Sequence, residues 1–312
     1  MDTRKSLDRT AVGLMLMLCL IWALQQIVLK HTAADITPMF QIALRSGVAA
    51  ALLALLMRSR GERMSFTDGT AWPGVIAGTL FALEFCLVGE GLRHTSAAHM
   101  VVFLYTAPIF AALGLHFYLP TERLAPLQWL GIALAFSGLA IAFFGRQQTA
   151  APAPGNILWG DFLGLMAGAF WGATTVVIRT TRLSQAPASQ TLMYQLLGGF
   201  GLLSLFSLVT DQAHFNPTPT VWASLAFHSI VVAFVSFLLW FWLLRQYMAS
   251  RLGVFSFLTP LFGILLGAWL LDERVEPSFL MGSIPVLLGI VLVSGHGWIS
   301  HALVKPAGKR TP

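Results

Sequence analysis

The sequence predicts an all-α integral membrane protein in which ten transmembrane helices form two inverted five-helix repeats. Its composition gives the first indication, since 56% of the 312 residues are hydrophobic and only 10% are charged. Soluble domains carry about 25% charged residues. Ten separate apolar runs and an internal repeat with a nearly constant offset give the second and third indications. A soluble globular protein is excluded, because such a chain could not cover its apolar surface in water.

Each apolar run has close to the ~20 residues that a helix needs to cross the hydrocarbon core. Lipid offers no partner for exposed backbone N–H and C=O groups, so each run is expected to be an α-helix. The first run follows three basic residues and is too long for the apolar part of a signal peptide, so it is interpreted as a retained span. The ten expected spans cover residues 11–30, 38–57, 72–91, 97–118, 126–144, 158–178, 188–209, 221–242, 250–271 and 278–297.

The positive charges predict the orientation. With the N-terminus in the cytoplasm and the spans alternating, fourteen of the 19 Lys and Arg residues fall inside and four fall outside, while Arg45 lies within a span. This bias follows the positive-inside rule, which also explains the net charge of +6 without a nucleic-acid partner. Both termini are therefore expected to be cytoplasmic, and the linker 145–157 is expected to face outward.

The two halves of the chain repeat each other. Trp22 and Trp171 are 149 residues apart, as are Pro38 and Pro187, and Pro108 precedes Pro260 by 152. Because each half has an odd number of spans, the second copy would be upside down in the bilayer, as is typical of secondary transporters. The expected organisation is a first repeat over 1–148, a second over 156–301 and a cytoplasmic tail over 302–312.

An ordered set of short motifs resembles the EamA-type branch of the drug/metabolite transporter (DMT) superfamily. This resemblance covers nearly the whole chain and implies ten helices, cytoplasmic termini, and export or exchange of small metabolites without ATP. Glu84 departs from it, since the family usually has an apolar or weakly polar residue there. The motifs are Ile21-Trp22 with Lys30, Pro38 with Ala43-Leu44-Arg45, Gly91-Leu92-Arg93-His94-Thr95-Ser96-Ala97-Ala98, Tyr105-Thr106-Ala107-Pro108, Thr121-Glu122-Arg123-Leu124, Asp161, Trp171, Leu258-Thr259-Pro260 and Asp272-Glu273-Arg274-Val275.

Arg45 and Glu84 are the leading site candidates, because an ionisable residue within the hydrocarbon region is costly and by default indicates function. At 1.5 Å per residue, Arg45, Glu84, Gln25 and Tyr105 are all expected at ~9–12 Å below the outer face. One interpretation is a cavity in which Arg45 holds an anionic substrate group and Glu84 permits proton coupling. The alternative is a static salt bridge between Arg45 and Glu84.

Other candidates depend on weaker signals. Trp22, Trp171 and Tyr194 could stack on a substrate, although aromatic residues also fill helix interfaces. Pro108 and Pro260 are interpreted as hinges, because proline removes a helical hydrogen bond. Asp161 is interpreted as an acid at a helix start, where it can cap free N–H groups.

The predicted function is a secondary, non-ATP transporter for small organic metabolites in the bacterial cytoplasmic membrane, with a proton as the possible coupling ion. An intramembrane enzyme or a channel is the alternative, although the sequence has neither the paired intramembrane acids nor the His-Glu-x-x-His motif of such enzymes. His94, His99 and His116 lack the spacing of a zinc site. We expect no cofactor, no metal and no nucleic-acid partner, and a monomer or homodimer in the bilayer.

Overall fold

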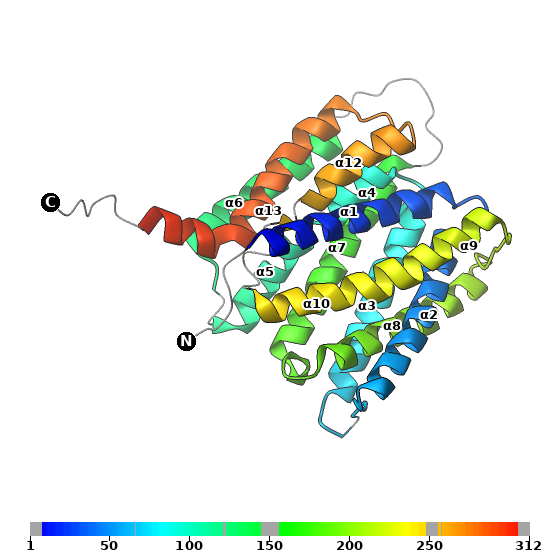
Figure 1. The fold of residues 1–312 in the computed structure, drawn as a ribbon. Helices are drawn as coiled ribbons and strands as arrows, with labels where there is room; N and C mark the ends of the chain where they lie inside the picture. The colour runs from blue at the N-terminus through cyan, green and yellow to red at the C-terminus, as the bar shows by residue number, and fades with distance from the viewer. Residues whose placement is uncertain are drawn as a thin grey trace.

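The computed structural model describes residues 8–65, 67–120, 123–144, 156–247, 255–256 and 258–304, and this part of the chain is helical with no β-strand. An isolated bridge pairs Ile36 with Phe215. In chain order the helices are α1 (Arg9–His31), α2 (Pro38–Ser59), α3 (Ala71–Gly91), α4 (Ala97–Leu104), α5 (Ala107–Tyr118), α6 (Pro126–Phe144), α7 (Ile157–Thr180), the 3-10 turn η2 (Arg182–Ser184), α8 (Ala188–Val209), α9 (Pro219–Ala226), the π-helical segment η3 (Phe227–Ser236), α10 (Phe237–Gln246), α12 (Leu258–Leu270) and α13 (Pro277–Val304) (Figure 1).

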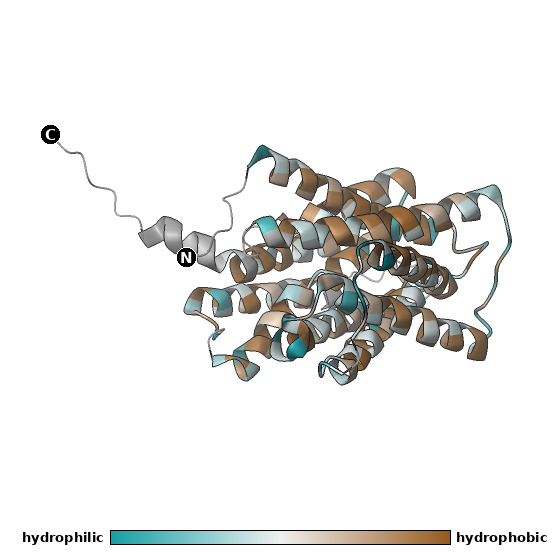
Figure 2. Cartoon of the chain, turned by 60° about the horizontal axis from the view of Figure 1, so that its bottom comes forward, coloured by the Kyte–Doolittle hydropathy of each residue, from teal (hydrophilic) through white to brown (hydrophobic). Residues whose placement is uncertain are grey.

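The helices have the length and polarity of membrane spans. Within the described ranges, seven helical stretches are long and apolar enough to cross a membrane. Three shorter apolar helices, Pro126–Ala142, Leu258–Leu270 and Pro277–Val293, lie where the fifth, ninth and tenth spans are expected. Apolar residues cover the flanks of the bundle, while hydrophilic residues gather at helix ends and loops (Figure 2). The prediction of an all-helical, multi-pass membrane protein is confirmed.

Two of the spans are irregular near their middle. Tyr105 and Thr106 separate α4 from α5, and Pro108 lies in the first turn of α5, where a missing N–H costs nothing. The second irregular span is the continuous rod α9–η3–α10, whose centre is π-helical. Such π-helical turns occur frequently at functional sites. Pro260 lies in the first turn of α12, and residues 248–254 before it lie outside the described residues.

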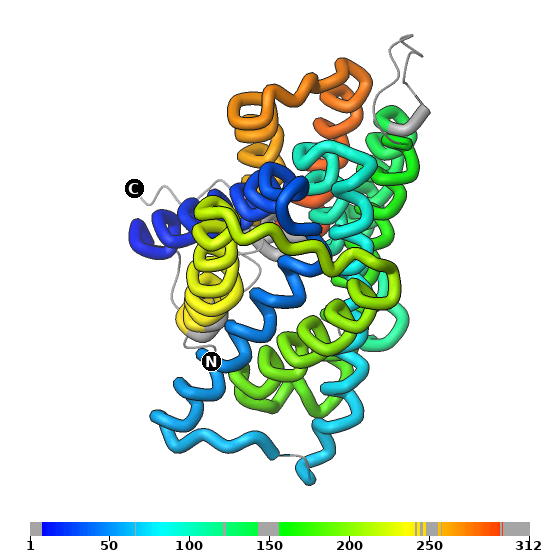
Figure 3. Tube along the Cα trace, turned by 90° about the vertical axis from the view of Figure 1, so that its right-hand side faces the viewer, coloured from blue at the N-terminus to red at the C-terminus, as the bar shows by residue number. Residues whose placement is uncertain are grey.

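Glycine residues permit a very close contact between α6 and α13. A Cβ atom at Gly138 would lie 2.4 Å from the Gly282 carbonyl oxygen, and one at Gly282 would lie 2.5 Å from that of Gly138. Gly131 and Gly289 repeat this contact two turns away. The two helices run side by side at one edge of the molecule (Figures 1 and 3). Small residues therefore serve to bring these backbones together within one chain.

A second close contact joins α3 to α8, and it crosses between the two halves of the chain. A Cβ at Gly198 would lie 2.4 Å from the Gly78 carbonyl oxygen, and one at Gly78 would meet the Tyr194 carbonyl oxygen at the same distance. Neither helix can therefore move closer to the other at this contact, which lies about two turns before Glu84 along α3.

Candidate functional site

Arg45 is the most deeply buried charged residue of α2, with only 1% of its surface exposed. Pro38 begins α2, and its fixed φ suits a first helical position. Two turns later, Arg45 Nη1 donates a hydrogen bond to Gln25 Oε1 of α1 at 2.8 Å. The guanidinium also lies 4.6 Å from the centre of the Phe85 ring of α3, a cation–π distance. Three helices therefore position one cation in the interior of the bundle.

Glu84 precedes Phe85 on α3 and is 4% exposed. Its carboxylate interacts electrostatically with Arg45. Among the described residues, however, no ion pair links Glu84 to Arg45 and no side chain or backbone N–H donates a hydrogen bond to its carboxylate. The static salt bridge that the sequence leaves as the alternative is therefore not formed in this structure. Arg45 and Glu84 lie near each other, and each retains the capacity to bind another charged group.

His228 in η3 belongs to the same cluster, although the sequence analysis did not select it. Its ring is completely buried, with Nδ1 2.8 Å from the Ser224 carbonyl oxygen and Nε2 3.1 Å from the Gln25 carbonyl oxygen. Gln41 Nε2 lies 3.2 Å from Nδ1. An imidazole within an apolar span was the available sequence signal, because ionisable groups in spans are rare. His228 connects the backbone of Gln25 to α2 and to the second half of the chain.

Three of the four predicted aromatic residues lie at contacts between the halves. The Tyr105 and Trp171 rings meet edge to face with centroids 5.2 Å apart. Trp22 Nε1 donates to Ser236 Oγ at 3.0 Å, and its ring meets Trp240 at 5.7 Å. These rings connect α1 and the junction between α4 and α5 to α7, η3 and α10.

Tyr194 is not brought to the Arg45 cluster. Its hydroxyl lies 3.4 Å from both Thr70 Oγ1 and the Ser65 carbonyl oxygen. Those residues follow the C-terminal end of α2, whereas Arg45 lies near its N-terminal end. Tyr194 is seven residues after Pro187 and Arg45 is seven after Pro38, so equivalent sequence positions occupy opposite ends of the bundle.

Asp161 and His99 form a second buried polar cluster, between α7 and α4. His99 Nδ1 lies 2.9 Å from Asp161 Oδ1, and Thr95 Oγ1 donates to the same oxygen at 2.5 Å. The His99 ring stacks on Phe279, with centroids 3.7 Å apart. The interpretation of Asp161 as a helix cap is wrong, since Asn156 Oδ1 accepts the bond that caps α7. Asp161 is instead one turn further into the helix and joins the two halves.

Replacing Asp161 with alanine should lower the midpoint of thermal unfolding by several degrees. The change leaves His99 and Thr95 without their buried acceptor, which typically costs about 1–3 kcal/mol. We would measure unfolding in detergent for Asp161→Ala, His99→Ala and the double variant. Non-additive losses are expected, because residues in one network couple energetically. Strictly additive losses would show that the pair makes no stabilising interaction.

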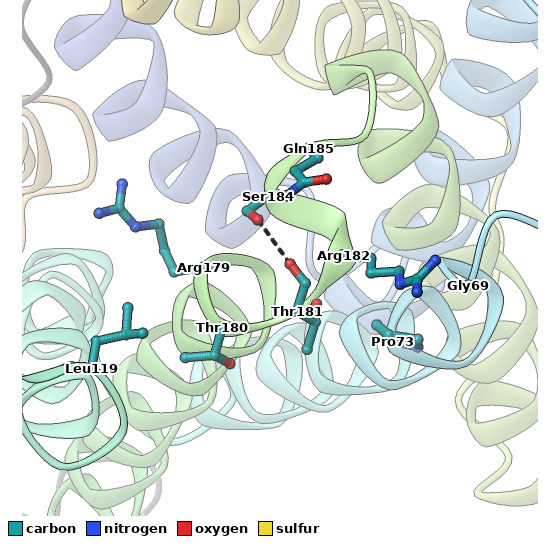
Figure 4. A pocket seen from close by; sticks show the side chains of 9 residues that line it. All are labelled: Gly69, Pro73, Leu119, Arg179, Thr180, Thr181, Arg182, Ser184 and Gln185. Atoms are coloured by element: carbon teal, nitrogen blue, oxygen red, sulfur yellow. Dashed lines mark hydrogen bonds between the residues drawn. The ribbon is translucent and has the colours of Figure 1, made fainter.

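Neither cluster resembles a metal site, since no three His, Cys, Asp or Glu side chains gather within the described ranges. A surface hollow of about 510 Å³ opens where α7 ends, beside the start of α3. The side chains of Arg179 and Arg182 point away from each other around it (Figure 4). They do not converge on a common ligand position, so the buried Arg45 cluster remains the candidate site. The lining consists of Gly69, Pro73, Leu119, Arg179, Thr180, Thr181, Arg182, Ser184 and Gln185.

Comparison with known proteins gives the family. The profile of the EamA-like transporter family matches the chain twice, at residues 9–144 and 158–295. The chain belongs to the EamA-like transporter family. It is 24% identical over 281 residues to the uncharacterized transporter YoaV of Bacillus subtilis, covering 88% of this chain and 92% of that one. It is 27% identical over 289 residues to a chloroplastic WAT1-related protein of Arabidopsis thaliana, covering 88% and 66%.

A solved crystal structure has the same fold. It superposes with a TM-score of 0.65 at 18% sequence identity, covering 96% of this chain and all of the other. Several relatives, YoaV among them, are named transporters, which supports a transport role and a small-molecule substrate for this EamA-family protein. The resemblance expected from the sequence motifs is therefore confirmed at the level of the family.

Proposed function

We propose that this EamA-family protein is a secondary transporter that exports or exchanges small organic solutes carrying an anionic group across the cytoplasmic membrane. The observation that carries the proposal is the buried Arg45 guanidinium, which Gln25 and Phe85 hold and which forms no direct ion pair with the nearby Glu84. A buried cation that no carboxylate contacts directly is energetically costly, so an anionic ligand that bound Arg45 would stabilise it. Tyr105 and Trp171 would offer apolar ring surface to the remainder of the solute.

Ten spans in two inverted halves would give this site access to either side in turn. Equivalent local contacts in the two halves support the repeat. Thr32 Oγ1 donates to the Val28 carbonyl oxygen and Thr181 Oγ1 to that of Val177, again at an offset of 149 residues. Alternating access follows if the halves rock around the fixed central site.

Glu84 would couple transport to protons. Its carboxylate accepts no hydrogen bond from the described residues, although it lies within electrostatic range of Arg45. When an anionic group binds Arg45, Glu84 loses its nearby positive charge and takes up a proton more readily. Proton binding and solute binding would then favour each other, as linkage requires.

The test of transport is solute flux in liposomes. Purified protein would first be screened by thermal shift with organic acids and zwitterionic amino acids, because a ligand that binds the folded state raises its melting point. A stabilising solute would then be loaded into proteoliposomes and its radiolabelled form added outside. A carrier should show faster uptake with internal solute present than without it. Stabilisation without any flux would contradict a transport role.

The proposed orientation has its own test. Single cysteines would be placed in the linker 145–157 after Cys19 and Cys86 are replaced. A membrane-impermeant maleimide should label them in intact cells, since this linker is predicted to face outward. Labelling confined to inverted vesicles would overturn the orientation.

A further inference from the structure

We infer that Gln41 and Gln190 hold two equivalent gates, one at each end of the Arg45 site, which open in turn during transport. The inference rests on the proposed function and assigns its conformational change to named side chains. It is based on two sets of hydrogen bonds between the halves of the chain. These are named the Gln41 seam and the Gln190 seam.

The Gln41 seam joins residues 32–41 to residues 212–228. Gln41 is completely buried; its Nε2 donates to Ser224 Oγ, and its Oε1 accepts from Thr32 Oγ1 at 2.9 Å. Thr37 Oγ1 donates to the Gln212 carbonyl oxygen nearby. Further out, the Asn216 backbone N–H donates to the Asp35 carbonyl oxygen at 2.8 Å, and the Asn216 side chain donates to the Asp35 carboxylate at the same distance.

The Gln190 seam joins residues 62–65 and 67–70 to residues 182–194. Gln190 is 2% exposed, and its Nε2 donates to Thr70 Oγ1 at 2.7 Å and to the Ser65 carbonyl oxygen at 2.9 Å. Hydrogen bonds from Thr70 hold the pKa of Asp68 below its usual value, so this carboxylate stays charged and also accepts from Gln190. At the rim of the seam, Arg182 Nη1 donates to the Asp68 carbonyl oxygen at 3.1 Å.

The two seams are equivalent in sequence and opposite in position. Each glutamine lies three residues after the proline that begins the local repeat, and the two glutamines are 149 residues apart. Gln41 is in the first turn of α2, whereas Ser65 and Thr70 follow the other end of this 22-residue helix. At 1.5 Å per residue the seams are therefore separated by roughly 30 Å, the thickness of the hydrocarbon core.

Each seam is suited to act as a gate because it holds the halves together through polar contacts. Breaking it exposes amide and hydroxyl groups that water in an open vestibule can satisfy, so its net cost is modest, at about 1 kcal/mol per bond. An apolar seal of the same size would expose surface that water does not stabilise. In this structure both seams are intact and Arg45 is only 1% exposed, as the closed state of the two gates requires.

The two seams differ in how their hydrogen bonds connect them to Arg45. His228 contacts Gln41 and also the Gln25 carbonyl oxygen, while the Gln25 side chain accepts from Arg45. The Gln190 seam instead includes Tyr194, which occupies the position equivalent to Arg45. A ligand that withdraws Arg45 from Gln25 would therefore disturb the Gln41 seam directly, whereas the Gln190 seam would respond through movement of α8.

The test measures access to the site from each face, without any transported solute. In a chain with Cys19 and Cys86 replaced, Tyr105→Cys is the reporter for a membrane-impermeant sulfonated maleimide. Labelling rates would be compared in right-side-out and inverted vesicles. Gln41→Ala is expected to raise the rate at least about threefold from one face only, and Gln190→Ala from the opposite face only. The double variant should be labelled from both faces.

Gln26→Ala is the matched control. Gln26 is 1% exposed, and neither polar atom of its side-chain amide has a hydrogen-bond partner among the described residues. The control removes the same atoms without opening a seam, so its labelling should equal that of the parent. If Gln41→Ala does not fold, Ser224→Ala opens the same seam from the other side. Equal labelling rates for all variants would refute the assignment of the two gates. Increased labelling from the same face for Gln41→Ala and Gln190→Ala would refute it as well. The liposome flux of the parent protein tests the transport role separately, because the labelling assay uses no solute.

Discussion

Arg45→Gln is expected to abolish transport of the solute identified by thermal shift and to weaken its binding at least about 30-fold. Truncating one member of a buried, hydrogen-bonded charge pair costs about 2–5 kcal/mol, which corresponds to a factor of about 30 to several thousand. The substitution removes a buried charge and keeps a polar side chain, so folding should be retained. Binding would be measured by isothermal titration in detergent, and transport by counter-flow in liposomes.

Two further variants separate this role from that of a static ion pair. Arg45→Lys keeps the charge but loses the planar geometry that meets Gln25 and Phe85 together, so we expect partial binding. The swap of Arg45→Glu with Glu84→Arg should remain inactive, because Arg45 and Glu84 form no ion pair that the swap could restore. Glu84→Gln should keep solute binding and lose the pH dependence of flux. Recovery of transport by the swap would refute the assigned roles.

Gly138→Ala and Gly282→Ala are each expected to reduce folded yield severely or lower the melting point by many degrees. The added methyl would lie 2.4 Å or 2.5 Å from a carbonyl oxygen of the facing helix, and backbone atoms cannot rotate away as a side chain can. Overpacking of this kind typically costs about 1–3 kcal/mol and sometimes more. Yield and unfolding would be followed by size-exclusion chromatography and a thermal ramp in detergent.

Gly13→Ala and Gly201→Ala are the matched controls for this steric prediction. A Cβ at either position meets no heavy atom within 4 Å, so the same chemical change adds no clash. Alanine is also the better helix former, so both controls should match or exceed the parent in yield. A loss of stability at Gly201 equal to that at Gly138 would mean that helix packing between α6 and α13 is not the cause.

The candidate site was only partly predictable from sequence. Arg45 and Glu84 could be selected because charged residues are rare within apolar spans, and their depth follows from counting residues along each helix. Their partners could not, because each residue turns a helix by about 100° and a small rotation decides what a side chain meets. In the structure Arg45 contacts Gln25 and Phe85, and it forms no ion pair with Glu84.

The contacts of His228 and of the two seam glutamines could not be predicted from the sequence either. A polar residue within a span is visible in the sequence, but its purpose depends on which segment of the other half faces it. Gln41 meets Ser224 and Gln190 meets Thr70 across more than a hundred residues of chain. The sequence suggested Tyr194 as a substrate-binding residue together with Arg45. Tyr194 belongs to α8, however, and lies beside the end of α2 that is farther from Arg45.

The sequence by itself determined that this chain is an all-helical, multi-pass membrane protein and a member of its family. Both follow from properties summed over many residues, namely apolar length, charge bias and an ordered set of motifs, so small local errors do not change them. Only the tertiary structure decided which polar groups pair and which glycines touch. Those outcomes depend on the rotation and separation of helices to within about one ångström, and contacts between distant segments set these quantities.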